Sequence, residues 1–201
     1  VGGIGTIYAT RRISGREERF CNITSWCVLD AYRKQSMRLA MAVVEQPGYN
    51  FTDFSPTEVV GGVLRFLKFK PIDDRYTVIL NLPLPFAAGR VISEPSGIAA
   101  ALTGDALQTY RDHTGFPWLR HVLVGDGSSW CHVIYKPRSF KGLPSADLIH
   151  VSDEAVFSRH IRRLTAHFLM QGMVSTHVET RHLKCNIQPS RIRSGFNPRL
   201  Y

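Results

Sequence analysis

Residues 19–38 read RFCNITSWCVL-DAYRKQ-SMR, and this stretch contains the pattern that decides the fold. Its first part, 19–29, is rich in aromatic and β-branched residues, which predicts a long strand. A polar turn over 30–35 follows. The apolar run from Ser36 to Gln46, stopped by Pro47-Gly48, predicts a buried helix of about three turns. The centre of the first half is therefore a strand that passes through a basic turn directly into a helix.

The neighbouring segments extend this unit in both directions. Residues 3–9 predict a strand antiparallel to 19–29, because the turn signal Ser14-Gly15 lies between them. After the first helix we expect a short strand over 49–54, a second helix and a closing strand over 75–82. The predicted order in the first half is β-β-α-β-α-β.

The second helix has the clearest start signal in the sequence. Ser55-Pro56-Thr57-Glu58 supplies an N-cap, a proline at the first helical position and a glutamate placed to close a capping box. The helix is expected to run to about Lys68. The residues expected to be buried are Val59, Val60, Val63, Leu64 and Leu67.

Residues 2–83 resemble the central part of the GNAT (GCN5-related) acyl-CoA N-acyltransferases. The resemblance rests on the strand and turn of 19–35, the helix from Ser36 and the second helix ending Leu67-Lys68-Phe69-Lys70. In that family the strand-to-helix turn reads Gln or Arg, two residues, Gly, one residue, and Gly or Ala. Here the matching residues are Arg33-Lys34-Gln35-Ser36-Met37-Arg38. The resemblance implies an α/β (α+β) fold, with a mixed, mainly antiparallel sheet flanked by helices.

The same resemblance implies where acetyl-CoA, or another acyl-CoA, binds as co-substrate. The expected site residues are Trp26, Cys27 and Val28 beside the pantetheine arm, and Arg33, Lys34, Gln35, Ser36, Met37 and Arg38 around the pyrophosphate. A helix N-terminus has unpaired N–H groups and a partial positive charge, so its backbone can bind a pyrophosphate. Ser36 and Arg38 replace the two small residues of the family pattern. The basic turn is either a phosphate site or a solvated surface. Cations beside a helix N-terminus are unfavourable unless an anion is bound, which favours the phosphate site.

The positions of the family's general base and general acid carry other residues here. Asn22 lies where some members have a glutamate, and Leu64 lies where a tyrosine often acts as the acid. Neither can transfer a proton, so catalysis would depend on water or on a carboxylate such as Asp30 or Asp53. Two functions are open. One is acetyl transfer to an unidentified small-molecule or peptide amine, and the other is a catalytically inactive GNAT-like protein that binds CoA or another anionic partner for regulation or assembly.

The second half of the chain repeats a similar order of elements. Residues 83–97 contain three prolines and two glycines, which predicts a connection with a boundary near 86–90. We expect a GNAT-like core segment over 1–85 and a second sheet-helix half over 86–201. Its expected elements are a helix over 106–113, a hairpin of 118–124 and 130–135, a strand over 147–151, a helix from the N-cap Asp153 to about Gln171 that buries Phe157, Ile161, Leu164 and Phe168, and a strand over 173–180. This order, without the basic turn, suggests a second, degenerate GNAT-like half.

Composition excludes some classes of protein. The chain has 201 residues, 44% of them hydrophobic, and a formal charge of +9. Its longest apolar runs, such as 39–44 and 78–82, are much shorter than the roughly 18 to 20 residues of a membrane span, so no membrane partner is expected. The last 21 residues carry five basic residues and no acid. Arg191-Ile192-Arg193, with Phe196 and Tyr201, allows a nucleic-acid-binding module, although the sequence makes nucleic acid an unlikely partner.

Cysteine and histidine spacing gives no metal signature. The four cysteines form no CxxC pair, which indicates free thiols and a cytoplasmic protein. None of the eight histidines has a metal-ligand spacing, and no GxSxG motif marks a hydrolase. His160 and His167 lie seven residues apart on one predicted helix, which is compatible with a shared site but is more typical of half-exposed surface. The sequence begins at Val1 within a predicted strand, as expected of a fragment. The oligomeric state is open, with a homodimer as one alternative.

Overall fold

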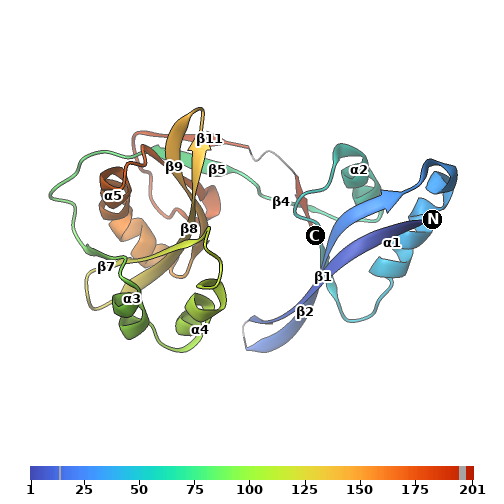
Figure 1. Cartoon of the computed structure of the whole chain (residues 1–201), viewed down its shortest axis with the longest axis horizontal. Coiled ribbons are helices and arrows are strands. Elements are labelled where there is room, and N and C mark those ends of the chain that lie inside the picture. The colour runs from blue at the N-terminus through green and yellow to red at the C-terminus, as the bar shows by residue number, and fades with distance from the viewer. Residues whose placement is uncertain (14, 195–197) are drawn as a thin grey trace. The chain divides into compact units, whose positions relative to one another are not determined.

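The computed structural model describes residues 1–13, 15–194 and 198–201, and the chain forms two compact units (Figure 1). Unit 1 is Val1–Asp74 together with the C-terminal end of the chain, and unit 2 is Arg75–Ser194. The sequence places the boundary later, near 86–90. The difference arises because the strand expected to close the first half belongs to the sheet of unit 2.

Unit 1 is built on the strand pair predicted at the start of the chain. β1 (Gly2–Ile13) and β2 (Arg16–Val28) are antiparallel, from Gly2 opposite Val28 to Ile13 opposite Arg16. β3 (Asn50–Thr52) lies parallel to β2 on its other side. The expected hairpin and short strand are confirmed, and the hairpin strands extend further than the sequence indicates.

The helix that follows the basic turn differs from the prediction. A 3₁₀ helix, η1 (Asp30–Gln35), continues directly into α1 (Ser36–Val44). Within α1 only Ala40 is buried, so the expected buried helix was wrong. A helix that covers one face of a small sheet buries a single stripe of side chains, and the remaining apolar residues of α1 stay partly or fully exposed.

The second helix, α2 (Glu58–Phe66), begins and ends two residues away from its predicted bounds. Its N-cap is Thr57, whose hydroxyl accepts the N–H of Val60, rather than Ser55. Of the five residues expected to be buried only Leu64 is, and Val59 is 79% exposed. Val59 lies on the first turn of α2, away from the face that buries Gly61 and Leu64.

Two strands belong to a different unit from the one that the sequence indicates. In unit 1, β12 (Arg199–Leu200) pairs with β4 (Pro71–Ile72), and Leu200 forms a bridge with Asp53 directly after β3. Residues 76–80 form β5 (Tyr76–Leu80), which pairs with two strands of unit 2. The prediction that this strand closes the first half was therefore wrong, and the C-terminal strand takes that place.

Unit 2 contains a seven-stranded sheet in the order β11-β5-β10-β9-β8-β7-β6. Its further strands are β6 (Arg90–Ile92), β7 (Arg120–Gly125), β8 (Trp130–Phe140), β9 (Leu143–Val151), β10 (Ser175–Glu179) and β11 (Ser190–Arg193). Neighbouring strands are antiparallel except for β9 and β10. The predicted hairpin of β7 and β8 is confirmed. The fold is thus the expected mixed, mainly antiparallel sheet with helices against it.

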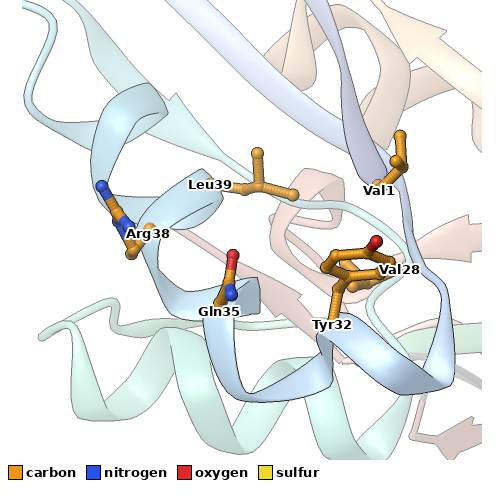
Figure 2. Close-up of a pocket in the computed structure, with 7 residues that line it drawn as sticks. Val1, Val28, Tyr32, Gln35, Arg38 and Leu39 are labelled. Atoms are coloured by element: carbon orange, nitrogen blue, oxygen red, sulfur yellow. The ribbon is translucent and has the colours of Figure 1, made fainter.

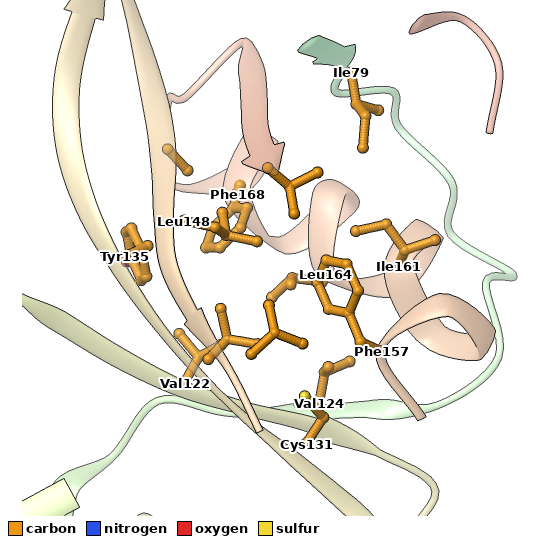
Figure 3. Close-up of a cluster of buried hydrophobic side chains, with 14 of the residues drawn as sticks. Ile79, Val122, Val124, Cys131, Tyr135, Leu148, Phe157, Ile161, Leu164 and Phe168 are labelled. Carbon is orange, nitrogen blue, oxygen red and sulfur yellow. The ribbon is translucent and has the colours of Figure 1, made fainter. Parts of the chain in front are cut away.

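Helices cover both faces of this sheet. α5 (Glu154–Met170) is capped by Asp153 as predicted, and its residues Phe157, Ile161, Leu164 and Phe168 lie in the main core (Figure 3). On the opposite face, α3 (Pro95–Ala101) and α4 (Gly104–His113) pack over Leu123 of β7. α3 begins inside the stretch 83–97, which was expected to be a connection, and extends beyond it. The short 3₁₀ helix η2 (Thr180–His182) follows β10.

Each of the two sheets contains a β-bulge and a pair of parallel strands that separate after three paired residues, which we call a fork. In unit 1, Ser25 is the extra residue of β2, and β2 pairs with β3 only over Phe20–Asn22. In unit 2, Ile149 is the extra residue of β9, and β9 pairs with β10 only over Ser145–Asp147. The recurrence supports the interpretation of two halves with one plan. Among the described residues, no helix combines the length and the apolar character that a membrane crossing requires.

Candidate functional site

The candidate site lies where β2 leaves β3. Beyond Asn22 the edge of β2 that faces β3 has no ladder partner in the part of the chain that the structure describes, and this edge continues to Val28. Ser25 has a φ of +47°, a left-handed conformation that residues other than glycine seldom adopt. A bulge bends the strand and leaves the extra residue out of the ladder. The edge therefore offers free N–H and C=O groups to a ligand.

The basic turn closes the end of this edge. The amide of Ser36 donates to the carbonyl of Arg33 because η1 continues into α1, so this amide is already hydrogen-bonded. Arg33 pairs with Asp30 at 2.7 Å, and both side chains are largely exposed. Neither Lys34 nor Arg38 has an acidic partner among the described residues. Two cations thus remain available beside a helix start that has no acid in its first turn.

A pocket of about 230 Å³ adjoins this turn. It is lined by Val1, Gly2, Val28, Tyr32, Gln35, Arg38 and Leu39. Figure 2 shows Gln35 and Leu39 pointing into the space in front of Tyr32, with Arg38 on the opposite side from Tyr32. The pocket therefore combines an apolar wall, an amide and a cation.

The pocket contains some of the predicted site residues and adds others. Val28, Gln35 and Arg38 were expected from the sequence and line it. The other expected residues, Trp26, Cys27, Arg33, Lys34, Ser36 and Met37, lie on the same segment but do not line it. Four residues that line the pocket were not expected from the sequence: Val1, Gly2, Tyr32 and Leu39. For Tyr32 and Leu39, the position within the turn and on the first turn of the helix was the signal that could have identified them.

None of the four residues considered from the sequence offers a free acid or base where β2 separates from β3. The amide oxygen of Asn22 accepts the hydroxyl hydrogen bond of Thr52 at 3.0 Å, and Leu64 is fully buried in the core of unit 1. Asp30 is exposed and paired with Arg33. Asp53 is 4% exposed, and its carboxylate accepts the N–H of Ser55 at 3.0 Å, while burial raises the pKa of the carboxyl. Both carboxylates therefore already have local structural partners.

His160 and His167, whose spacing is compatible with a shared site, have separate contacts, and His160 is buried rather than half-exposed. The ring of His160 lies 3.2 Å from the carbonyl of Ala88, whereas the ring of His167 contacts Phe168. Within the described residues no group of three or more His, Cys, Asp or Glu side chains could hold a metal ion. All four cysteines are free, as the sequence indicates.

Comparison with solved structures identifies the architecture. A GCN5-related N-acetyltransferase from Anabaena variabilis superimposes with a TM-score of 0.62 over 98% of this chain, at 12% sequence identity. The chain has a GNAT fold. A second GCN5-related N-acetyltransferase, from Kribbella flavida, matches with a TM-score of 0.60 over 100% of the chain at 13% identity. A probable N-acyltransferase from Enterococcus faecalis matches with a TM-score of 0.58 over 99% of the chain at 10% identity.

The GNAT fold covers nearly the whole chain, including unit 2, and not only residues 2–83 as the sequence indicates. The chain spans a little over half of these structures, namely 58%, 56% and 58% of their lengths. No protein-family model and no curated protein matches the chain. The structural likeness establishes the fold, and the activity is a separate question.

Proposed function

We propose that this GNAT-fold chain binds acetyl-CoA, or another acyl-CoA, as co-substrate in unit 1 and transfers the acyl group to a small-molecule or peptide amine. The observation that carries the proposal is the free edge of β2 beyond Asn22, which ends at a turn with two available cations, Lys34 and Arg38. Neighbours of the same fold are named N-acetyltransferases. A free strand edge next to cations suits a ligand that has amide groups at one end and phosphates at the other.

In this proposal the pantetheine arm of CoA lies along the edge of β2 at Trp26–Val28. Its amides would pair with backbone groups of the strand, so the identity of the side chains there matters little. The pyrophosphate would lie at the turn 33–38, with Lys34 and Arg38 as its cations. Because Arg33 already pairs with Asp30, its contribution is smaller than the sequence pattern implies.

The chemistry would need few groups from the protein. The acceptor amine attacks the thioester carbonyl, a C–N bond forms, the C–S bond breaks, and CoA leaves as the thiol with the proton that the amine gives up. A backbone N–H near Val28 would hydrogen-bond the carbonyl oxygen as negative charge develops on it. Most of the rate acceleration would come from holding the two reactants together.

The test is a calorimetric titration of the full chain with CoA and acetyl-CoA. We expect Arg38→Ala to weaken binding about tenfold or more, since a hydrogen bond to a charged group contributes about 1.5–3 kcal/mol. Arg33→Ala should weaken it less. Arg111→Ala, on the exposed surface of α4, removes the same charge in unit 2 and serves as the control. Equal affinity in Arg38→Ala and the control would count against the proposed pyrophosphate site.

A second candidate function is a GNAT-fold protein that binds CoA or another anion without turnover. It is favoured by Asn22 and Leu64 at the family's base and acid positions, because neither side chain titrates; Asn22 accepts a hydrogen bond from Thr52 and Leu64 is buried. Acetyl transfer to a panel of amines separates the two functions. Tight CoA binding with transfer rates equal to those in buffer would establish the binding protein over the enzyme.

A further inference from the structure

A basic cluster lies on the face of the unit 2 sheet that is opposite α5. Cross-strand partners run from Lys136 of β8 through Asp147, His177 and Val78 to Arg191 of β11. Directly paired residues project from the same face of a sheet, so Lys136 and Arg191 share this face. We define the basic cluster as Lys136, Arg138, Lys141, Arg191 and Arg193.

The tip of the β8–β9 hairpin brings the two ends of this cluster together. The guanidinium of Arg193 lies 5.7 Å from the ring centroid of Phe140, and the ammonium of Lys141 lies 6.0 Å from the same centroid. Phe140 in turn contacts His177 at 4.6 Å between ring centroids, and Tyr76 stacks on His177 at 5.8 Å. His177 is itself buried, and the partly exposed rings of Phe140 and Tyr76 lie among the cations at this surface.

The cluster has few acids to neutralise it. Unit 2 has 14 Lys and Arg residues against 8 Asp and Glu. Two acids share this face: Asp147 pairs with Arg138 at 3.0 Å, and Glu179 pairs with Arg181 at 2.6 Å. For the other four members of the cluster the described residues provide no acidic partner. Grouped like charges repel one another, and a bound polyanion would offset that repulsion.

We infer that the basic cluster binds single-stranded nucleic acid, independently of the proposed CoA site in unit 1. Spaced cations match the repeating phosphates of such a strand, and rings among the cations offer surfaces for unpaired bases. A sulfated polysaccharide would use the cations but not the rings. The sequence makes nucleic acid unlikely because Arg191 and Arg193 read there as part of a polar tail. In the structure they lie on an ordered strand, with Arg193 beside Phe140.

The test measures binding of fluorescently labelled oligo-dT and oligo-rU, of about 20 nucleotides, to the full chain at about 50 to 200 mM salt. Arg191→Ser with Arg193→Ser is compared with Arg111→Ser with Arg159→Ser, which removes two exposed charges from α4 and α5 outside the cluster. We expect the first pair to reduce the slope of log K against log salt by about 1.4, at about 0.7 per lost contact with a single strand. The control pair should keep the slope of the parent chain.

Three results would overturn the inference. They are an absence of oligonucleotide binding by the parent chain at the lowest salt, an equal loss in both variant pairs, and binding of heparin without binding of either oligonucleotide. Unchanged circular dichroism melting of both pairs shows that the variants fold. CoA titration of the first pair keeps the two proposals separate, because its affinity for CoA should equal that of the parent chain.

Discussion

At the scale of single residues, one side chain distinguishes the helix starts of the two units. Asp153 places its carboxylate on the N–H groups of Ala155 and Val156, both at 2.9 Å, at the start of α5. At the start of α1 the N-cap is Gln35, which makes no capping hydrogen bond. An acid at a helix N-terminus satisfies the amides that a phosphate would otherwise bind. Unit 2 therefore places its own carboxylate at the start of α5, whereas no side chain caps the start of α1 in unit 1.

Replacement of this cap should destabilise α5 without changing the affinity of the chain for CoA. We expect Asp153→Ala to lower the free energy of unfolding by about 1 kcal/mol, the usual loss for a removed N-cap, as measured by urea titration. Asp105→Ala is the matched control, because Asp105 lies in the first turn of α4 without capping it. A smaller loss for Asp153→Ala than for Asp105→Ala would contradict the assigned cap.

Two glycines give opposite expectations for the same substitution. A Cβ on Gly89, whose φ is +105°, would lie 2.6 Å from Nδ1 of His160 and 2.9 Å from the carbonyl of Gly125. Gly89→Ala should therefore destabilise the protein by about 1–3 kcal/mol. Gly62 lies inside α2 with no atom near its added Cβ, so Gly62→Ala should stabilise it by about 0.5–1 kcal/mol. Thermal unfolding of both variants checks the pair, and a shift of the same sign in both would refute the assignment.

At the scale of elements, three adjacent strands of unit 2 place histidines on one face under α4. His121 of β7 and His132 of β8 lie 3.1 Å apart between Nδ1 and Nε2, and His150 of β9 contacts the ring of His132. Tyr110 of α4 packs edge-on against the first two. Burial lowers the pKa of all three histidines, and that of His132 falls to about 3. Burial therefore favours the neutral form of all three imidazoles.

This arrangement predicts a loss of stability in acid. Because the pKa of His132 is lower in the folded state than its ordinary value of 6.5, the unfolded state binds more protons below about pH 6.5. The stability contributed by the neutral ring is present above that pH and is lost as the pH falls towards about 3. Urea unfolding at several pH values should show this decline, and His132→Leu should reduce its slope. An unchanged slope in His132→Leu would exclude a leading role for this ring.

At the scale of the whole molecule, unit 1 depends on a distant part of the chain, whereas unit 2 is built from the continuous stretch Arg75–Ser194. β12 closes unit 1 from the far end of the sequence, while β5, which directly follows unit 1, lies in the sheet of unit 2. Leu200 is fully buried in the core of unit 1 with Ile23 and Leu64. The proposed CoA site therefore relies on a strand that lies more than 160 residues beyond Arg38 in the sequence.

A substitution in β12 should affect the proposed CoA site by lowering the stability of unit 1. We expect Leu200→Ala to destabilise unit 1 by about 2–5 kcal/mol, as large-to-small changes in a core do, and to reduce the fraction of chains that bind CoA. Tyr201→Ala, next to it and 56% exposed, should change little. Amide hydrogen exchange in β2 and β3 checks the difference. If these strands in Leu200→Ala were as protected as in the parent chain, the role of β12 in the core of unit 1 would be contradicted.

The sequence by itself determined the elements whose signals are local. The β1–β2 hairpin, the β7–β8 hairpin and the start of α5 at Asp153 follow from residue pattern, turn type and capping, which act between residues close in the chain. The GNAT resemblance also located the turn at Arg33–Arg38 beside a long strand. Only the tertiary structure decided which sheet receives β5 and β12, and which of the turn's cations remain without a partner. Strand pairing between distant residues depends on the packing of the whole sheet. Short strands such as β12 have no local sequence pattern that specifies which strand they pair with.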